Sequence, residues 1–236
     1  MGEHAAARAW CSDAERQSHD VRHPEIAAWA ALTRALIAFY QGQPGRSVSL
    51  AAQGQQSAPS GTVIRVSLAA QEMRAAAMMG DAGRMTRARR RAAKDISLLP
   101  ADSGGLGVFS IAAGEDPPYT ATSMLLAGHF REASAAASRV IETVYSPQIR
   151  NGRPGGYARA LLILGLAQAG LGSLDEAAAA GHTALAESRV AWPTRVLAGK
   201  LDHALTQGFP NAREASAYHD RYLEVAAAGP RHLEWG

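Results

Sequence analysis

Two arginines stand in segments that are otherwise largely apolar, and they are the residues of this sequence best suited to hold a ligand. Arg74 lies in a run of alanine and methionine, and Arg159 lies among alanine and leucine. A charge on an apolar helix face is costly unless it is paired, and a guanidinium can hold a carboxylate through two parallel hydrogen bonds. Each arginine is therefore expected to bind a ligand carboxylate, to form an internal salt bridge, or to point into solvent.

A further group of cations forms the only basic cluster of the chain. Its main members recur at helical spacing; they are Arg84, Arg87, Arg91 and Lys94. One interpretation is a solvated outer face of a helix. The other is contact with an acidic partner or with a phosphate backbone, which would make binding strongly dependent on salt. No aromatic residue lies between these cations, which argues against single-stranded nucleic acid.

No set of residues has the spacing that catalysis or metal binding requires. Among the eight histidines, His19 and His23 are four residues apart. Pro24 marks a helix boundary next to His23, so the two histidines are not expected to lie on one face of a helix. Cys11 has no evident base beside it, and the glycines at residues 104–107 lack the Lys-Ser/Thr pair of a phosphate-binding loop. We therefore expect no catalytic residue, no metal site and no cofactor.

The composition predicts that helices position these residues. Of the 236 residues, 47% are hydrophobic, with alanine the main contributor, and only 6% are aromatic. Alanine favours helices, whereas strands need the β-branched and aromatic residues that are scarce here. The fold class is therefore expected to be all-α.

Charge and cysteine content narrow the class of protein further. The formal net charge is only +3, less than a dedicated nucleic-acid binder usually carries. A single cysteine excludes an intramolecular disulfide and a four-thiolate zinc site. The first residues do not resemble a secretory signal, and no stretch approaches the ~18 apolar residues of a membrane span. We expect a cytoplasmic protein without membrane contact.

The helices are expected to pair into hairpins, because one turn motif recurs along the chain. A glycine separates two alanine-rich segments at Gly42, Gly80, Gly128 and Gly172, with spacings of 38 to 48 residues. Tetratricopeptide repeats have a period of ~34 residues, so the units are expected to carry inserted loops. The prediction is a tetratricopeptide-like superhelix (an α-solenoid) of about eleven helices, forming a single domain over residues 1–236 with an irregular insertion at about residues 100–118.

Apolar periodicity and turn residues predict where the helices lie. Small residues such as Gly165 and Ala177 are expected where the two helices of a hairpin pass closest, and Phe130 and Leu174 are expected to pack the corners after their turns. The principal helices are expected over residues 3–18, 28–40, 45–56, 63–79, 82–99, 194–206 and 212–227.

A stack of hairpins offers a concave face, which is the expected binding surface. The candidate residues for binding a ligand or peptide there are Trp29, Arg74, Tyr119, Thr122 and Arg159. Tyr119 ends an irregular segment that starts at residue 104. One interpretation of this segment is a lid over the groove, since long loops in compact domains are often functional; the other is a simple crossing between hairpins.

The order of several short segments resembles a known family. The segments are Pro24-Glu25, Ala28-Trp29, Ala35-Leu36, Tyr40, Gly42-Gln43-Pro44, Gly107-Val108-Phe109 and Gly128-His129-Phe130-Arg131-Glu132-Ala133. Together they resemble the tetratricopeptide-like C-terminal sensor region of actinobacterial transcriptional regulators that carry a helix-turn-helix domain of the xenobiotic-response-element type. The resemblance covers roughly residues 4–225. Residues 1–70 contain no DNA-reading helix-turn-helix, so the chain is expected to be an excised sensor region or a free-standing relative.

These observations predict a protein-interaction or ligand-sensing domain associated with transcriptional regulation. The expected ligand is a peptide, a small signalling molecule or a partner protein in the concave groove, and a terminal helix is expected to pack on a second copy in a homodimer. DNA is expected only indirectly, through a separate helix-turn-helix domain. Two alternatives stay open: an enzyme or biosynthetic accessory protein that encloses a small molecule in the groove, and direct DNA contact through the helix at residues 84–94.

Overall fold

The structure is a computed structural model that describes residues 4–20, 22–100, 103, 116–145, 154–186 and 192–228. Within these ranges there are eleven helices and no strand, which confirms the predicted all-α class. The chain divides into two compact units, Met1–Ala127 and Gly128–Gly236, here called the first and the second unit. Most of the predicted insertion at about residues 100–118, including the glycines at 104–107, lies outside the described residues.

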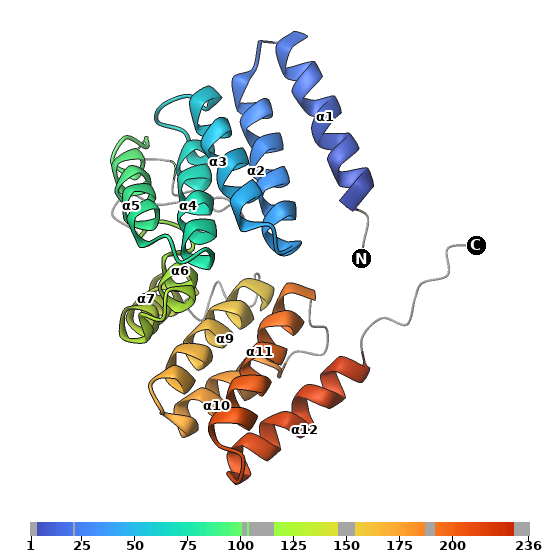
Figure 1. Ribbon diagram of the computed structural model, residues 1–236, viewed down its shortest axis with the longest axis vertical. Coiled ribbons are helices and arrows are strands. Elements are labelled where there is room, and N and C mark those ends of the chain that lie inside the picture. Colours follow the sequence, from blue (N-terminus) through green and yellow to red (C-terminus); the bar gives the residue numbers. More distant parts are fainter. Residues whose placement is uncertain are drawn as a thin grey trace, which may run out of the picture. The chain divides into compact units, whose positions relative to one another are not determined.

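The described part of the first unit holds six helices (Figure 1). In chain order they are α1 (His4–Asp20), α2 (Pro24–Tyr40), α3 (Pro44–Ser57), α4 (Val63–Met78), α5 (Ala82–Ile96) and α6 (Thr120–Leu126). The described part of the second unit holds α7 (Phe130–Thr143), α9 (Pro154–Gly170), α10 (Leu174–Ala184), α11 (Trp192–Gly208) and α12 (Arg213–Ala227). The seven helices predicted with bounds all form, and each begins and ends within four residues of its prediction.

The predicted turn glycines are confirmed by their backbone conformation. Each has a positive φ: Gly42 (71°), Gly80 (73°), Gly128 (76°) and Gly172 (83°). This left-handed conformation costs roughly 1–2 kcal/mol for a residue with a β-carbon. After three of these glycines the next N–H donates to the carbonyl five residues earlier, as in a Schellman motif; the pairs are Gln43 with Ala38, Asp81 with Ala76, and Ser173 with Gln168. The recurring glycine therefore ends one helix and aims the chain into the next.

Helix α4 is the centre of the first unit. It packs against α2, α3, α5 and α6, and residues 66–77 are all buried. Its Ile64 and Leu68 join Leu32 of α2 in one hydrophobic cluster. Helix α3 approaches closely at Gly54, where an added β-carbon would lie 2.8 Å from the Leu68 side chain. A charged group in this buried part of α4 therefore cannot rely on water for its hydrogen bonds.

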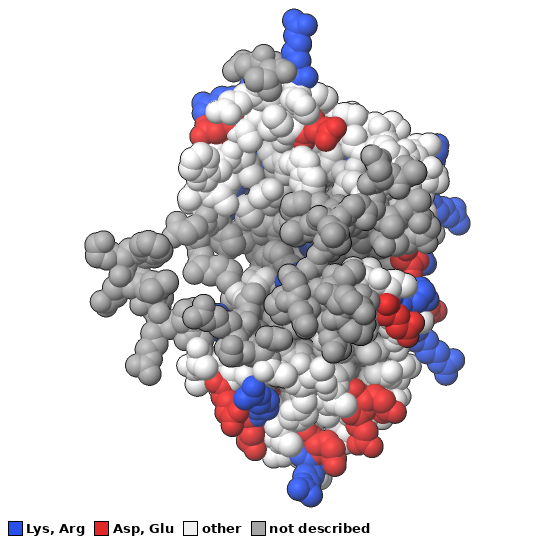
Figure 2. All heavy atoms as spheres, turned by 180° about the vertical axis from the view of Figure 1, so that it is seen from behind, with Lys and Arg blue, Asp and Glu red and all other residues white. Residues whose placement is uncertain are grey.

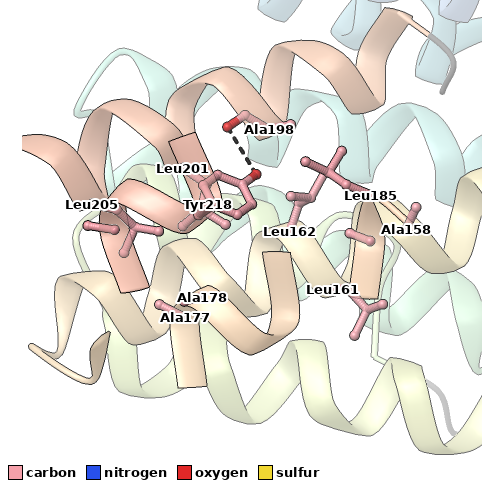
Figure 3. Close-up of a cluster of buried hydrophobic side chains, with 12 residues drawn as sticks. Ala158, Leu161, Leu162, Ala177, Ala178, Leu185, Ala198, Leu201, Leu205 and Tyr218 are labelled. Atoms are coloured by element: carbon pink, nitrogen blue, oxygen red, sulfur yellow. Dashed lines mark hydrogen bonds between the residues drawn. The ribbon is translucent and has the colours of Figure 1, made fainter. Parts of the chain in front are cut away.

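The second unit is organised around Tyr218 of α12 (Figure 3). Its ring packs in one cluster with Leu162 of α9 and Leu201 of α11, and its hydroxyl donates a hydrogen bond to the carbonyl of Ala198 at 3.2 Å. Burial raises the pKa of the Tyr218 hydroxyl well above its ordinary value. The residue therefore stays neutral and contributes to packing.

The packing predicted for the hairpin of α9 and α10 is confirmed. An added β-carbon at Gly165 would lie 3.1 Å from the carbonyl oxygen of Ala177, so the two helices approach each other closely there. Leu174 packs against the core of the second unit. The Phe130 ring lies against Gly170, where an added β-carbon would be 2.6 Å from the ring.

None of the helices in the described ranges combines the length and the apolar character that crossing a membrane requires.

Candidate functional site

The Arg74 side chain of α4 lies in contact with aromatic rings inside the first unit. Its guanidinium carbon is 4.1 Å from the centre of the Phe39 ring and 4.1 Å from that of Tyr119, and the Tyr40 ring centre is 5.6 Å away. Only 5% of Arg74 is exposed. A desolvated cation–π contact is worth about 2 kcal/mol, but a ring face is no substitute for an oxygen acceptor. The N–H donors of Arg74 still need partners.

A short chain of hydrogen bonds fixes one edge of this guanidinium. Arg74 Nη2 donates to Gln71 Oε1 at 2.6 Å. Gln71 Nε2 donates to the Ser47 hydroxyl at 3.0 Å, and that hydroxyl donates to the carbonyl of Ala35 at 2.8 Å. Gln71 and Ser47 are themselves buried. The orientation of Arg74 is therefore set within α4 and through contacts to two neighbouring helices, α3 and α2.

The Nε–H of Arg74 is unsatisfied. Its Nε is buried and has no hydrogen-bond partner, and in the described part of the chain no carboxylate forms an ion pair with the guanidinium. An unsatisfied buried donor costs about 1–3 kcal/mol, and more when it is charged. A guanidinium offers donors in a planar fork that matches a carboxylate. A group with an anionic oxygen would supply the acceptor and the counter-charge that Arg74 lacks.

Tyr119 reaches Arg74 from the segment just before α6. Its φ is +64°, a left-handed conformation that few residues other than glycine adopt. The Tyr119 carbonyl accepts hydrogen bonds from the backbone N–H and from the hydroxyl of Ser123, both at 2.8 Å. Strain of this kind costs about 1–3 kcal/mol and gathers at functional sites. It places the Tyr119 ring on the guanidinium.

The predicted binding residues are only partly brought together. Arg74 and Tyr119 are in contact. Trp29 packs against the hydrophobic cluster of the first unit, and Thr122 is half-buried on α6. Arg159 is half-buried on α9, in the second unit.

Besides Tyr40, three residues of the Arg74 site were not predicted as ligand-binding. Phe39 has the apolar spacing of a core residue, which conceals its contact with Arg74. Ser47 lies on the next helix with no distinguishing neighbour. Gln71 lies one helical turn before Arg74, and this spacing is the one signal that could have found it.

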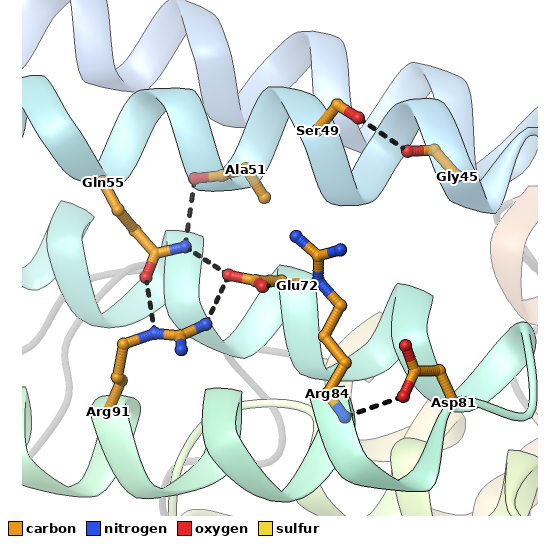
Figure 4. A network of polar contacts seen from close by, with 8 residues as sticks. All are labelled: Gly45, Ser49, Ala51, Gln55, Glu72, Asp81, Arg84 and Arg91. Atoms are coloured by element: carbon orange, nitrogen blue, oxygen red, sulfur yellow. Dashed lines mark hydrogen bonds and ion pairs between the residues drawn. The ribbon is translucent and has the colours of Figure 1, made fainter.

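The predicted basic cluster is partly neutralised inside the protein (Figure 4). Glu72 of α4, with 4% of its side chain exposed, accepts from Arg84 Nε at 2.9 Å and from Arg91 Nη2 at 2.7 Å. Gln55 Nε2 donates to the same carboxylate at 2.8 Å. Two of the four predicted cations therefore serve the packing of α5 on α4.

The hydrogen bonds to Glu72 decide its ionisation. Burial by itself raises the pKa of this carboxyl, but the donors from Gln55, Arg84 and Arg91 outweigh burial and lower the pKa below its usual range. Glu72 is therefore ionised near neutral pH and compensates the arginines around it.

The remaining cations of the cluster lie at the surface. Arg87 and Lys94 are exposed and have no ion pair with a residue that the structure describes. On the face shown in Figure 2, basic and acidic side chains are both scattered over the coloured surface rather than gathered by sign. A phosphate backbone approaching α5 would meet fewer free charges than the sequence suggests.

No other group in the described chain forms an evident catalytic or metal centre. His219 Nδ1 lies 2.9 Å from Asp202 Oδ1, which joins α12 to α11. Where the structure describes the chain, no three residues among histidine, cysteine, aspartate and glutamate are grouped so that they could hold a metal ion. Arg74 is therefore the strongest candidate for a functional residue.

The comparisons with known proteins add no relative: no family model, no curated protein and no solved structure matches this chain.

Proposed function

We propose that this chain is a regulatory ligand-binding module of tetratricopeptide-like helical hairpins, and that Arg74 holds the carboxylate of a peptide or of a small signalling molecule. The observation that carries the proposal is the buried Nε–H of Arg74, which has no hydrogen-bond partner. A bound carboxylate would supply both the acceptor and the counter-charge. The unsatisfied Nε–H of Arg74 therefore indicates a ligand that carries a carboxylate.

The surroundings of Arg74 favour a binding role over a structural one. No carboxylate that the structure describes pairs with Arg74, and an uncompensated buried charge costs stability, so the stability of the fold gives no reason for an arginine at this position. Gln71 and Ser47 hold the guanidinium in one orientation. Preorganisation of this kind reduces the entropy that a ligand must lose on binding.

The aromatic residues add apolar surface next to the charge. Phe39, Tyr40 and Tyr119 all lie within 5.6 Å of the guanidinium carbon, measured to their ring centres. Ligand sites are commonly apolar with a few placed polar groups. A carboxylate attached to an apolar portion therefore suits this site better than a simple inorganic ion.

The regulatory part of the proposal rests on the hairpin turns and on the resemblance to sensor regions of actinobacterial transcriptional regulators. A ligand that pairs with Arg74 more strongly in one conformation than in another would shift the population of those conformations. Tyr119 is the residue best placed to differ between them, because its strained backbone leads directly into α6. DNA contact would come from a separate helix-turn-helix domain. The module would work in the cytoplasm, where the free Cys11 stays reduced.

The test is a thermal-shift screen of small carboxylic acids and of short peptides with a free C-terminal carboxylate, each paired with its amide. A ligand at 100 times its Kd adds about 2.7 kcal/mol to the free energy of unfolding. We expect at least one carboxylate to raise the melting temperature of the wild type while its amide does not. Arg74→Gln should lose this response, and Arg87→Gln, at an exposed arginine of α5, should keep it. A screen in which no compound separates the wild type from Arg74→Gln contradicts the proposal.

A further inference from the structure

A second positively charged site lies in the first unit, away from Arg74. A pocket of about 200 Å³ opens among α1, α2 and α3, and an arginine from each of these helices lines it. The three are Arg8, Arg34 and Arg46. Its polar rim also includes Ser12 and Gln41, and its apolar wall includes Ile37 and Leu50.

The charge of this pocket is only partly compensated. Arg34 is satisfied: its Nη1 lies 2.7 Å from Glu15 Oε1, and its Nη2 donates to the Ser12 hydroxyl at 2.8 Å. Arg8 has no ion pair in the described chain, and its Nη1 makes only a long contact of 3.4 Å to Gln41 Oε1. Arg46 is exposed and forms neither a hydrogen bond nor an ion pair with any described residue. Three guanidinium groups therefore meet one carboxylate.

Arginines from different helices that line one pocket favour the binding of an anion. Each guanidinium presents several donors and accepts nothing, so Arg8 and Arg46 cannot satisfy each other's donors. Carboxylate and phosphate oxygens are the groups that this donor arrangement recognises. The pocket is smaller than the ~300–1,000 Å³ typical of drug-sized ligands, and it is apolar along one wall. Its ligand therefore has a single anionic head and a short apolar portion.

We propose that this pocket binds a small organic oxyanion, with Arg8 and Arg46 closing on its carboxylate or phosphate head and with its apolar portion against Ile37 and Leu50. Arg34, already held by Glu15 and Ser12, orients the head between them. The bound anion joins α1 to the hairpin of α2 and α3. This inference is independent of the function proposed for Arg74.

The test is isothermal titration calorimetry of the full chain at low salt with three probes: butyrate, butyl phosphate and inorganic phosphate. At least one of the two butyl compounds is expected to bind saturably and more tightly than inorganic phosphate, because only the butyl compounds contact the apolar wall. Which of them binds more tightly identifies the head as carboxylate or phosphate. Raising the salt concentration should weaken the interaction.

Variants connect the binding to the pocket. Arg46→Gln and Arg8→Gln should each weaken it about tenfold or more, the effect of losing a charge-assisted hydrogen bond, whereas Arg90→Gln on the exposed part of α5 should not change it. Arg74→Gln should also retain it, which separates this site from the one proposed above. Because Arg46 is exposed and forms no hydrogen bond or ion pair with a described residue, its variant is expected to keep the fold, and circular dichroism checks this.

Hydrogen exchange supplies an independent readout. Saturation with the tighter butyl probe should slow amide exchange in α1 of the wild type and leave it unchanged in Arg46→Gln. The proposal is overturned if none of the three probes binds, if inorganic phosphate binds as tightly as both butyl compounds, or if Arg46→Gln and Arg8→Gln bind as the Arg90→Gln control does.

Discussion

Arg74 and Glu72 lie two residues apart in the buried part of α4, yet their surroundings are opposite in character. Glu72 receives hydrogen bonds from Gln55, Arg84 and Arg91, so its charge is both solvated by donors and compensated. Among the residues that the structure describes, the Arg74 side chain has one hydrogen bond, to the neutral Gln71, together with its aromatic contacts. A compensated buried charge supports the fold, whereas an uncompensated one costs stability. Substitutions at the two positions should therefore have different effects.

The first prediction concerns the stability of an Arg74→Met variant. Methionine fills a similar volume and adapts to irregular spaces, and it removes the unsatisfied Nε–H. The lost cation–π contacts and the lost donor to the buried Gln71 Oε1 oppose this gain. We expect the free energy of unfolding, measured by urea denaturation, to fall by no more than about 2 kcal/mol. A loss above about 3 kcal/mol would show that Arg74 mainly supports the fold.

The second prediction concerns pH and Glu72. Because the pKa of Glu72 is lower in the folded protein than its ordinary value, its ionised form contributes stability at neutral pH, and this contribution disappears as the pH falls through the folded pKa. Glu72→Gln should cost about 1–3 kcal/mol at pH 7, at the lower end because Arg84 and Arg91 are partly exposed and can be hydrated. The difference from the wild type should shrink at acidic pH in urea denaturation.

A matched control exists for this carboxylate. Glu224 pairs with Arg221 at 2.9 Å on α12, but 66% of its side chain is exposed. Exposed pairs of this kind contribute about 0–1 kcal/mol. Glu224→Gln should therefore differ little from the wild type at any pH. A flat difference between Glu72→Gln and the wild type across pH would contradict the account of Glu72.

Among the helices, the turn glycines are the positions where a single substitution isolates backbone conformation from packing. Gly80 has a φ of 73° and no atom within 4 Å of an added β-carbon. Gly80→Ala should therefore cost roughly 1–2 kcal/mol through conformation alone, and Gly80→Asn should cost less. Gly45 has the same open surroundings inside α3, so Gly45→Ala should stabilise by about 0.5–1 kcal/mol. Thermal unfolding of the three variants checks both signs.

The helices and their turns could be predicted from the sequence because their causes are local. Alanine-rich periodicity favours helices, and a glycine such as Gly42 or Gly172 meets a need of the backbone at its own position. The contacts of side chains across helices could not be predicted in the same way. Glu72 reaches Arg84 and Arg91 only because α4 and α5 have one particular rotation about their axes.

At the Arg74 site, too, the side-chain contacts between elements could not be predicted from the sequence. Its importance was predictable, since an arginine in an apolar segment must be explained. Tyr119 was among the predicted binding residues, but its contact with Arg74 and that of Phe39 were not predictable, because both lie far from Arg74 in sequence and on different elements. The left-handed backbone of Tyr119 has no local signal of the kind that glycine provides.

For the whole chain, the balance of charge indicates whether it can bind duplex DNA directly. The formal net charge is +3, and Arg84 and Arg91 of the predicted basic cluster are engaged by Glu72. Non-specific binding to duplex DNA depends on free cations that displace counterions. We therefore predict no measurable binding of this chain to duplex DNA at about 150 mM salt, tested by a fluorescence anisotropy titration. Tight, salt-sensitive binding that Arg87→Gln weakens would contradict this prediction and would support direct DNA contact through α5.

The central claim is that the unsatisfied Nε–H of Arg74 is completed by a ligand carboxylate, and the most direct measurement of it is nuclear magnetic resonance. The protein would be labelled with 15N-arginine, and the Nε–H signal of Arg74 would be assigned from its loss in Arg74→Gln. On titration with the best carboxylate from the thermal-shift screen, this signal should shift saturably and exchange more slowly with water, while the Arg87 signal stays unchanged. A compound that binds with the same affinity yet leaves the Arg74 signal unmoved would contradict the account.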